Sequence, residues 1–319
     1  MRKKSLPSSR PGLPDSRRAL TVGAFLERWL DDVVAVSVRP TTAASYRYVV
    51  ARRLIPEFGG TRLVELNATA VQGFLARELR RGQAASTVRQ TLRILRVALE
   101  RARRFGLVRE NVARAVATPR VARPVIIPLD PRSVRGLLRA ARGEPVERVL
   151  VLGLLGLRAG EVRGLRWEDL EFARRRLHVR RTAQWAGRGL DILPPKTRAS
   201  VRTLSLPRFV ARALVRVPRR ERRGFVFAGP RGTPLHGTVL QRWLDALVER
   251  AGVKREVTMH LLRHTAAAML LESAVHLRVV MNVLGHVRMQ TTIELYGHLR
   301  PELHADAARV MDAWVHEQR

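Results

Sequence analysis

The chain has 319 residues, of which 46% are hydrophobic and 27% charged, proportions that are ordinary for a globular protein. Its charge balance is unusual, because 60 Lys and Arg residues against 27 Asp and Glu residues leave a formal net charge of +33. This excess favours a polyanionic partner, nucleic acid before a small acidic substrate, and predicts binding that weakens steeply with salt. A basic membrane-surface protein stays open on charge alone.

Several classes are excluded by what the sequence lacks. No apolar run approaches the roughly 20 residues needed to span a bilayer, and no signal-peptide core follows the basic residues 1–18. The absence of cysteine excludes disulfides, a thiolate zinc site and a cysteine nucleophile. We therefore expect no membrane partner and a cytoplasmic protein that associates with the nucleoid.

Residues 1–20 contain prolines, serines and scattered arginines without apolar periodicity, which predicts a flexible basic tail. From Thr21 onward apolar residues recur at helical spacing, and further helical stretches follow at 41–54, 68–80 and 86–105. The pattern predicts a helical domain over 21–116. Few acidic residues separate the arginines on its polar faces, so we expect DNA contacts there rather than only a solvated surface. The candidates are Arg47, Arg52, Arg89, Arg93 and Arg96.

Prolines between residues 117 and 131 predict an interdomain linker, and the second domain is expected over 132–319. Segments 176–184, 190–193 and 201–206 are rich in β-forming residues between Gly and Pro, which predicts a small antiparallel sheet. Helical patterns surround them, at 133–142, 147–155, 238–251, 259–272, 277–284, 289–296 and 302–317. The predicted fold class is mainly α with a small antiparallel β-sheet. The last helix can dock on a neighbouring protomer or pack on its own domain.

Four segments of the second domain carry the chemical signal. They are GLRAGEVRGLRWEDL (156–170), PPKTRASVRTLSLP (194–207), HLLRHTAAAMLL (260–271) and LGHVRMQTTIELYGH (284–298). In this order they resemble the catalytic domain of tyrosine recombinases of the phage-integrase type, over about residues 130–300, with a weaker resemblance over about 20–115. The resemblance implies a helical core DNA-binding (SAM-like) domain followed by a mixed α/β catalytic domain.

The resemblance implies that Arg158 and Arg263 clamp the scissile phosphate. Planar guanidinium groups suit this role, because they hydrogen-bond the charged oxygens of the transition state without losing a proton. Glu161 would support the arginines, its alternative being a helix-surface ion pair. Tyr296 would be the nucleophile; only Tyr46, Tyr48 and Tyr296 occur, so the second domain has one tyrosine. A phenol of pKa about 10 is a modest nucleophile and a leaving group good enough for religation.

His260 and His286 match two further site positions, where imidazoles hydrogen-bond the phosphate or assist proton transfer, and which does what stays open. Lys196, one of four lysines, matches a hairpin lysine that protonates the departing 5′ oxygen. His264 is expected to pack or hydrogen-bond beneath the site. His260 and His264 are four residues apart, but Leu261 stands where a metalloprotease pattern requires Glu. We therefore predict no metal and no cofactor.

Leu261 also departs from the family pattern, since similar proteins usually carry Asp there. An acidic partner for the active-site His or Arg is therefore missing at this position, and whether its loss lowers activity cannot be read from the residues. The resemblance implies a site-specific DNA recombinase or integrase that cuts and rejoins duplex DNA through a 3′-phosphotyrosine and a Holliday junction, without metal or ATP. Its expected partners are double-stranded DNA, three further protomers in a tetramer on DNA, and accessory directionality factors.

Three alternatives remain at this stage. A noncatalytic DNA-binding protein on the same fold would keep the charge and lose the chemistry. A type IB topoisomerase-like enzyme would share the phosphotyrosine step without site specificity, and a basic ribonucleoprotein component would explain composition alone. The target sequence, and the choice between integration, excision and dimer resolution, cannot be read from the residues.

Overall fold

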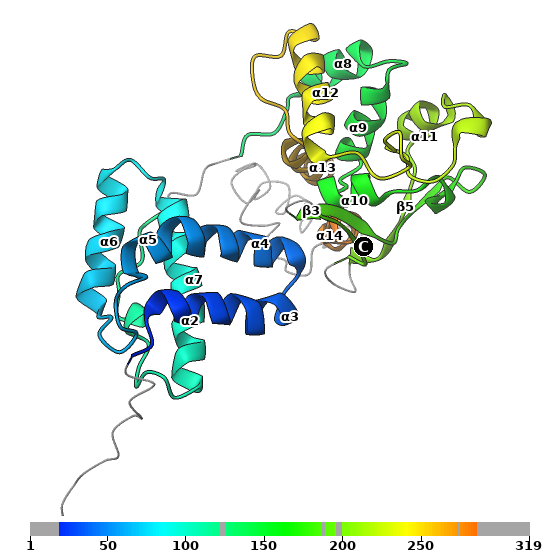
Figure 1. The fold of residues 1–319 in the computed structure, drawn as a ribbon. Helices are drawn as coiled ribbons and strands as arrows, with labels where there is room; N and C mark the ends of the chain where they lie inside the picture. Colours follow the sequence, from blue (N-terminus) through cyan, green and yellow to red (C-terminus); the bar gives the residue numbers. More distant parts are fainter. Residues whose placement is uncertain (1–18, 122–125, 187–188, 196–199, 274, 286–319) are drawn as a thin grey trace, which may run out of the picture. The chain divides into compact units, whose positions relative to one another are not determined.

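The computed structural model describes residues 19–121, 126–186, 189–195, 200–273 and 275–285. The chain divides into two compact units, residues 1–123 and 124–319, and each has its own apolar core (Figure 1). The described part is mostly helical with small antiparallel sheets, which confirms the predicted fold class. Within these described ranges no helix is long and apolar enough to cross a bilayer.

The first unit is built from helices whose starts follow the capping residues of the sequence. Thr21 accepts a hydrogen bond from Ala24 N at 3.2 Å, and Asn67 accepts one from Ala70 N at 2.9 Å. Two runs contain a π-helical turn, η1 and η2, inside otherwise α-helical chain. The elements are α2 (Val22–Arg28), η1 (Trp29–Val34), α3 (Ala35–Ser37), α4 (Pro40–Val49), η2 (Val50–Leu54), α5 (Ile55–Phe58), α6 (Ala68–Arg80), α7 (Ala85–Arg104) and the 3₁₀ turn η3 (Val112–Arg114).

Aromatic pairs and one long helix form the core of this unit. Trp29 stacks on Tyr46 with ring centroids 5.7 Å apart, and Phe58 meets Phe74 edge-on at 5.3 Å. Helix α7 buries residues three and four apart, as its apolar periodicity predicts. The buried leucines and valine of this face are Val88, Leu92, Leu95 and Leu99.

Acidic residues in the first unit are shared between arginines. Glu100 lies 2.8 Å from Arg103, 3.7 Å from Arg104 and 3.1 Å from Arg114. The hydrogen bond from Arg103 is the largest of several effects that lower the pKa of Glu100 to about 2. Glu78 likewise pairs with two arginines, at 3.0 and 3.2 Å. A single carboxylate is therefore shared by more than one cation.

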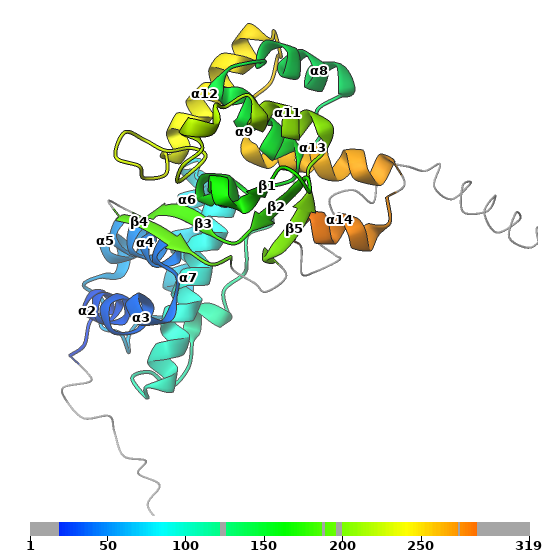
Figure 2. The same cartoon turned by 90° about the vertical axis from the view of Figure 1, so that its right-hand side faces the viewer.

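In the described part of the second unit, five helices contact α9, and two small sheets lie beside α10 and α14 (Figures 1 and 2). Its helices and turns are α8 (Pro131–Ala140), α9 (Pro145–Leu154), α10 (Ala159–Gly164), η4 (Trp167–Asp169), α11 (Arg208–Val215), η6 (Arg219–Glu221), α12 (Gly237–Arg250), α13 (Met259–Glu272) and α14 (Leu277–Leu284). Its strands are β1 (Leu170–Glu171), β2 (Arg176–Val179), β3 (Thr182–Ala186), β4 (Gly189–Leu193) and β5 (Arg202–Ser205).

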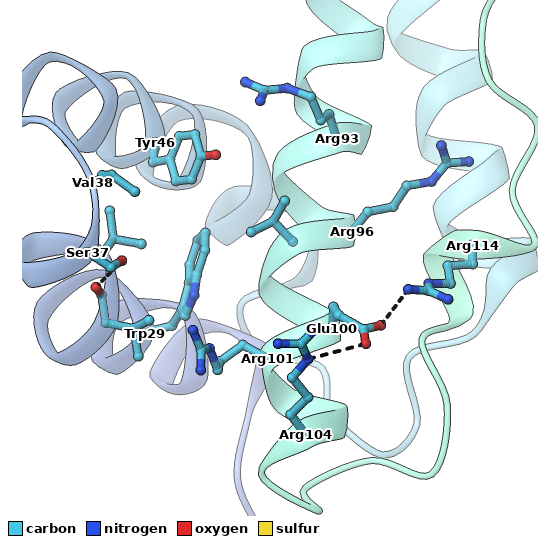
Figure 3. A pocket seen from close by; sticks show the side chains of 13 residues that line it. Trp29, Ser37, Val38, Tyr46, Arg93, Arg96, Glu100, Arg101, Arg104 and Arg114 are labelled. Carbon is cyan, nitrogen blue, oxygen red and sulfur yellow. Dashed lines mark hydrogen bonds and ion pairs between the residues drawn. The ribbon is translucent and has the colours of Figure 1, made fainter. Parts of the chain in front are cut away.

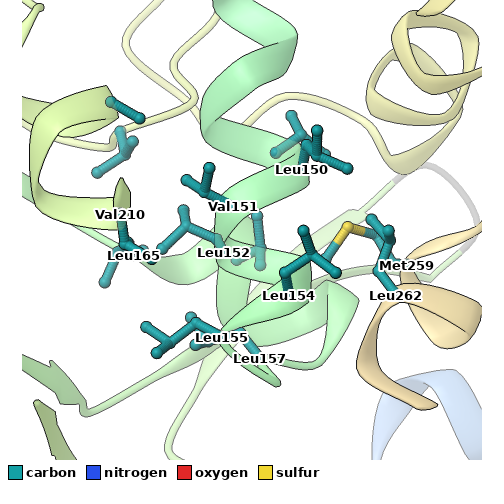
Figure 4. Packing of buried hydrophobic residues seen from close by; sticks show 14 of the residues in the cluster. Leu150, Val151, Leu152, Leu154, Leu155, Leu157, Leu165, Val210, Met259 and Leu262 are labelled. Atoms are coloured by element: carbon teal, nitrogen blue, oxygen red, sulfur yellow. The ribbon is translucent and has the colours of Figure 1, made fainter. Parts of the chain in front are cut away.

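Helix α9 is buried along most of its length, and Figure 4 shows leucines from it packed against α11 and α13. Helix α13 approaches α9 closely at Gly153, where a Cβ atom would lie 2.7 Å from Cδ1 of Leu262. Any larger residue at 153 would push α13 away. This packing fixes α13, which carries three predicted site residues, against the centre of the unit.

The strands form an antiparallel sheet in the order β1-β2-β5 and a separate β3-β4 hairpin. Leu177 of β2 pairs with Leu204 of β5, and both side chains are buried. Figure 2 shows α14 beside β5, and the two elements are in contact. The sheet therefore places β5 next to the last described helix.

The helices predicted over 259–272 and 277–284 have the predicted bounds in α13 and α14. Helix α11 and the short strand β1 were not predicted, and the single predicted sheet is divided into two. The predicted tail before residue 19 and the predicted helices at 289–296 and 302–317 lie outside the described residues.

Candidate active site

Arg158 stands at the start of α10, directly after the turn that ends α9. Gly156 makes this turn with φ +92°, and a Cβ atom there would lie 2.9 Å from Cδ2 of Leu284. The backbone N–H of Arg158 donates to Oε2 of Glu161 at 3.0 Å, as in a capping box. The segment Gly-Leu-Arg-Ala-Gly-Glu thus holds the backbone of Arg158 in place.

The Arg158 guanidinium lies between a carboxylate and a carbonyl. Its Nη1 donates to Oε1 of Glu161 at 2.8 Å, and its Nη2 donates to the carbonyl oxygen of Gly285 at 2.7 Å. The side chain is 38% exposed, so a phosphate can reach it from solvent. A guanidinium has five N–H donors, and these two contacts leave others for an anion.

Arg263, on α13, reaches the same end of α14. Its Nη1 donates to the carbonyl of Gly156 and its Nη2 to the carbonyl of Leu284. The residue is 7% exposed. The structure therefore brings the two predicted phosphate-clamping arginines, from different helices, to the adjacent carbonyls of Leu284 and Gly285.

A further arginine, Arg202 of β5, completes this cluster. Its Nη1 and Nη2 donate to the two carboxylate oxygens of Glu161, each at 3.0 Å, and its Nε donates to the carbonyl of Val283 at 2.7 Å. The Arg202 and Glu161 side chains are only 2% and 3% exposed. Burial acts to raise the pKa of Glu161, but the hydrogen bonds and charges of Arg202 and Arg158 outweigh it and the pKa is lowered. Glu161 is thus a buried carboxylate shared by two arginines.

The sequence interpretation missed Arg202, because a chain with 60 basic residues offers no reason to choose one of them. The available signal was the two-residue period of a strand. Arg202 shares a face with Leu204, and burial along β5 alternates accordingly. An arginine at an inward position of a strand needs a buried partner, which here is Glu161.

His260 and His264 form a close pair on the first turns of α13. Thr258 caps this helix by accepting a hydrogen bond from Leu261 N at 3.1 Å. The two Nε2 atoms are 2.7 Å apart, and the rings meet edge-on with centroids 4.2 Å apart. Burial lowers the pKa of both imidazoles, that of His264 to about 4, with the positive charge of Arg263 adding to the effect. Both rings are therefore neutral near pH 7, and His264 lies beneath the more exposed His260.

Leu261, where Asp was expected from the resemblance, is 7% exposed and belongs to the apolar core of the second unit. Its side chain packs among aliphatic neighbours rather than beside the site arginines. The structure thus offers no polar place for a carboxylate at this position.

Three predicted site residues, Lys196, His286 and Tyr296, lie outside the described residues. Two of them directly follow described residues: Lys196 comes after residue 195, and His286 comes after Gly285. Gly285 caps the end of α14 with a φ of +63°. In the residues that the structure describes, no group of three or more His, Asp or Glu side chains is arranged to hold a metal ion.

The candidate DNA-binding arginines of the first unit differ in their contacts. Arg47 pairs with Asp31 at 2.8 Å on the surface, and Arg52, Arg89 and Arg93 are exposed. Arg96 instead donates to backbone carbonyls, from Nε at 2.8 Å and from Nη2 at 2.7 Å. Its guanidinium is held by backbone carbonyls, whereas Arg47 pairs with a carboxylate at the surface and the Arg93 guanidinium lies 5.9 Å from the centroid of the Tyr46 ring.

A pocket of about 460 Å³ lies beside α7, the helix that carries Arg89, Arg93 and Arg96 (Figure 3). Trp29 and Tyr46 lie on one side of it, and Arg93 and Arg101 extend from α7 on the other. Glu100 also lines the pocket, with two of its arginine partners, Arg104 and Arg114. The lining therefore combines apolar side chains with several arginines.

Family models match both units. The model of the phage integrase family matches residues 129–302, and that of the phage integrase N-terminal SAM-like domain matches residues 21–78. The first match alone spans more than half of the chain.

Curated relatives match along most of their length. A protein named tyrosine recombinase XerD from Mycobacterium tuberculosis is 32% identical over 295 residues, covering 85% of this chain and 92% of the relative. A tyrosine recombinase XerC-like protein from Caldanaerobacter subterraneus subsp. tengcongensis is 23% identical and covers 95% of this chain and 85% of the relative. An integrase from Saccharopolyspora erythraea is 27% identical and covers 90% of this chain and 81% of the relative.

Solved structures show the same fold. The Tn1549 transposon integrase in complex with a circular intermediate DNA has a TM-score of 0.75 at 20% identity, covering 91% of this chain and 99% of that chain. A lambda integrase tetramer bound to a Holliday junction has a TM-score of 0.65 at 16% identity, covering 86% and 80%.

Proposed function

Because the chain belongs to the phage integrase family, the tyrosine recombinases, we propose that it cuts and rejoins duplex DNA through a covalent bond between Tyr296 and a backbone phosphate. Membership of the family makes the chain a site-specific DNA recombinase. The proposal concerns the residues and the steps by which it acts.

The observation that carries the proposal is the convergence of Arg158 and Arg263 at the end of α14, the helix that leads toward Tyr296. Attack of the phenol on a phosphate concentrates negative charge on the nonbridging oxygens, and donors fixed before the reaction stabilise that charge without reorganising. Glu161 fixes Arg158, both at its backbone and at its guanidinium. The two arginines would therefore bind the transition state more strongly than the ground state.

Proton transfer would fall to the remaining residues. The Tyr296 oxygen bonds to phosphorus as the bond to the 5′ oxygen breaks, which yields a 3′-phosphotyrosine and a 5′ hydroxyl. Lys196 would protonate the departing oxygen, and His260 and His286 would hydrogen-bond the phosphate or move the phenol proton. Attack by a 5′ hydroxyl of the partner duplex reverses the chemistry, so neither metal nor ATP is required.

The wider assignment rests on the family and its neighbours. We infer that 21–116 is the core DNA-binding domain, 117–131 the linker and 132–319 the catalytic domain. Arg52, Arg89 and Arg93 are exposed and supply the first domain with cations for DNA phosphates. Strand exchange through a Holliday junction requires four protomers on two duplexes. Accessory factors would set the direction of the reaction. The protein would act in the cytoplasm, on the nucleoid.

Covalent trapping tests the proposal. DNA from the flanks of the gene, nicked so that the 5′ hydroxyl fragment is lost, is incubated with the wild type and with Tyr296→Phe, with a chelator present throughout. We expect an adduct that resists denaturation and that requires Tyr296. Tight DNA binding without an adduct, on the flanks and on a broad fragment library, would instead support a noncatalytic DNA-binding protein.

A further inference from the structure

The last two residues of α14 and the capping residue Gly285 each give their carbonyl to a different arginine. The last carbonyls of a helix lack partners within the helix and carry the negative end of its dipole, so a guanidinium satisfies both needs. The pairs are Arg202 with Val283, Arg263 with Leu284 and Arg158 with Gly285.

Arg202 differs from Arg158, whose side chain is 38% exposed, because it is shielded from solvent. Its side chain is 2% exposed, and both of its terminal nitrogens are engaged by Glu161. Nη1 also donates to the carbonyl of Ser200 at 3.1 Å. Any effect of Arg202 on a reaction must therefore pass through the groups that it holds.

We propose that Arg202 is a positioning residue for DNA cleavage, an inference that rests on the proposed function. It fixes Glu161 against Arg158 and, through Val283, fixes the end of α14. The chain that leaves Gly285 toward His286 and Tyr296 thus starts from a defined point beside both phosphate-binding arginines. One buried side chain therefore contacts both the carboxylate that holds Arg158 and the end of the last described helix.

The geometry requires a guanidinium and a glycine. Lys has no planar fork, so it cannot contact both oxygens of Glu161 and also reach Val283. A Cβ atom at position 285 would lie 3.0 Å from Nη1 of Arg202 and 3.3 Å from Nη1 of Arg158, at a φ of +63°. A substitution at Gly285 therefore disturbs the same contacts without removing the buried ion pair.

The first test compares Arg202→Lys with wild type and with Arg181→Lys. Arg181 is a matched control, because its guanidinium also pairs with a buried carboxylate of the second unit, Asp169, at 2.6 Å. At saturating DNA we expect Arg202→Lys to lower the single-turnover rate of covalent cleavage roughly 10- to 100-fold. The Kd of Arg202→Lys for the same duplex should stay within about threefold of the wild-type value. Arg181→Lys should cleave at a rate within about threefold of the wild-type rate. We expect both results because each variant still binds the phosphate as the wild type does.

The second test reads the position of α14 without any activity. The chain has no cysteine, so one nitroxide label can be attached at Asn282→Cys, an exposed position of α14. A label at Met269→Cys, which is 46% exposed on α13, is the control. We expect Arg202→Lys to give a more mobile spectrum at residue 282 and an unchanged spectrum at residue 269.

The outcomes separate the two proposals. If Arg202→Lys does not unfold cooperatively, Gly285→Ala replaces it in both tests with the same expectation. An unchanged cleavage rate, an unchanged spectrum at residue 282, or an equal loss of rate in Arg181→Lys overturns the role of Arg202. A wild-type protein that forms no Tyr296-dependent adduct contradicts the proposed function instead, and the label at 282 still decides whether Arg202 holds α14.

Discussion

Nε2 of His264 lies 2.7 Å from Nε2 of His260, so the two rings hold one proton between these atoms. One ring donates and the other accepts, an arrangement that two imidazolium ions cannot make. Burial, then the charges of His260 and Arg263, lower the pKa of His264 to about 4. His264 therefore stays neutral in the folded protein under mildly acidic conditions.

This pair predicts a loss of stability in mild acid. Between the unfolded value of 6.5 and about 4, the unfolded chain binds a proton that folded His264 does not. The free energy of unfolding should therefore be fully retained above pH 6.5 and fall with decreasing pH, by up to about 1.4 kcal/mol per pH unit from this group. Urea unfolding at pH 7.5 and 5 should show a larger loss in wild type than in His264→Gln. Equal losses in the two proteins would show that His264 does not titrate in this way.

Leu261→Asp should destabilise the protein rather than activate it. Leu261 is 7% exposed in the apolar core, so a carboxylate there loses its hydration and the leucine packing is lost as well. We expect a loss of roughly 3 kcal/mol in the free energy of unfolding, measured in urea at pH 7.5. Leu261→Met, which keeps the volume, should lose less than about 1.5 kcal/mol. An Asp variant that is as stable as wild type and cleaves faster would contradict this account.

Arg89 and Arg96 stand two turns apart on α7 and should behave differently. Arg89 is exposed, so Arg89→Ala should lower the salt dependence of DNA binding, with the slope of log K against log salt changing by about 0.9. Arg96 is held by the carbonyls of Ala113 and Val116, so Arg96→Ala should lower the melting temperature instead. Binding titrations from 50 to 300 mM salt and thermal melts separate the two. The same slope change in both variants would refute the distinction.

Gly156→Ala should destabilise the second unit. Its φ of +92° is costly for alanine, and the added Cβ would meet Leu284 at 2.9 Å. The expected loss is about 1–3 kcal/mol in urea unfolding. Gly136→Ala is a control of opposite sign, because Gly136 lies inside α8 with nothing within 4 Å of its Cβ position. There we expect a gain of up to about 1 kcal/mol. Similar losses at both positions would mean that neither the φ value nor the contact at 156 matters.

The sequence predicted those elements whose signals are local. Helix α13 begins after the capping residue Thr258 and keeps its predicted bounds, whereas the segment predicted as one strand over 176–184 is divided between β2 and β3, which belong to different sheets. Helix α11 was missed because it is short, follows Pro207 directly and has no side-chain cap. The contacts of the site depend on residues far apart in the chain, such as Glu161 with Arg202, and no local pattern specifies them. The assignments of Lys196, His286 and Tyr296 stay predictions.

The sharing of Glu100 among several arginines has a consequence for how the chain tolerates mutation. Losing one of those arginines leaves the carboxylate with its other partners, so such changes can accumulate one at a time. Losing the carboxylate leaves three cations near one another, and no other acidic residue in the described part of the chain forms an ion pair with them. The chain has more than twice as many basic as acidic residues. Its few acidic residues are therefore the positions where a substitution is tolerated least.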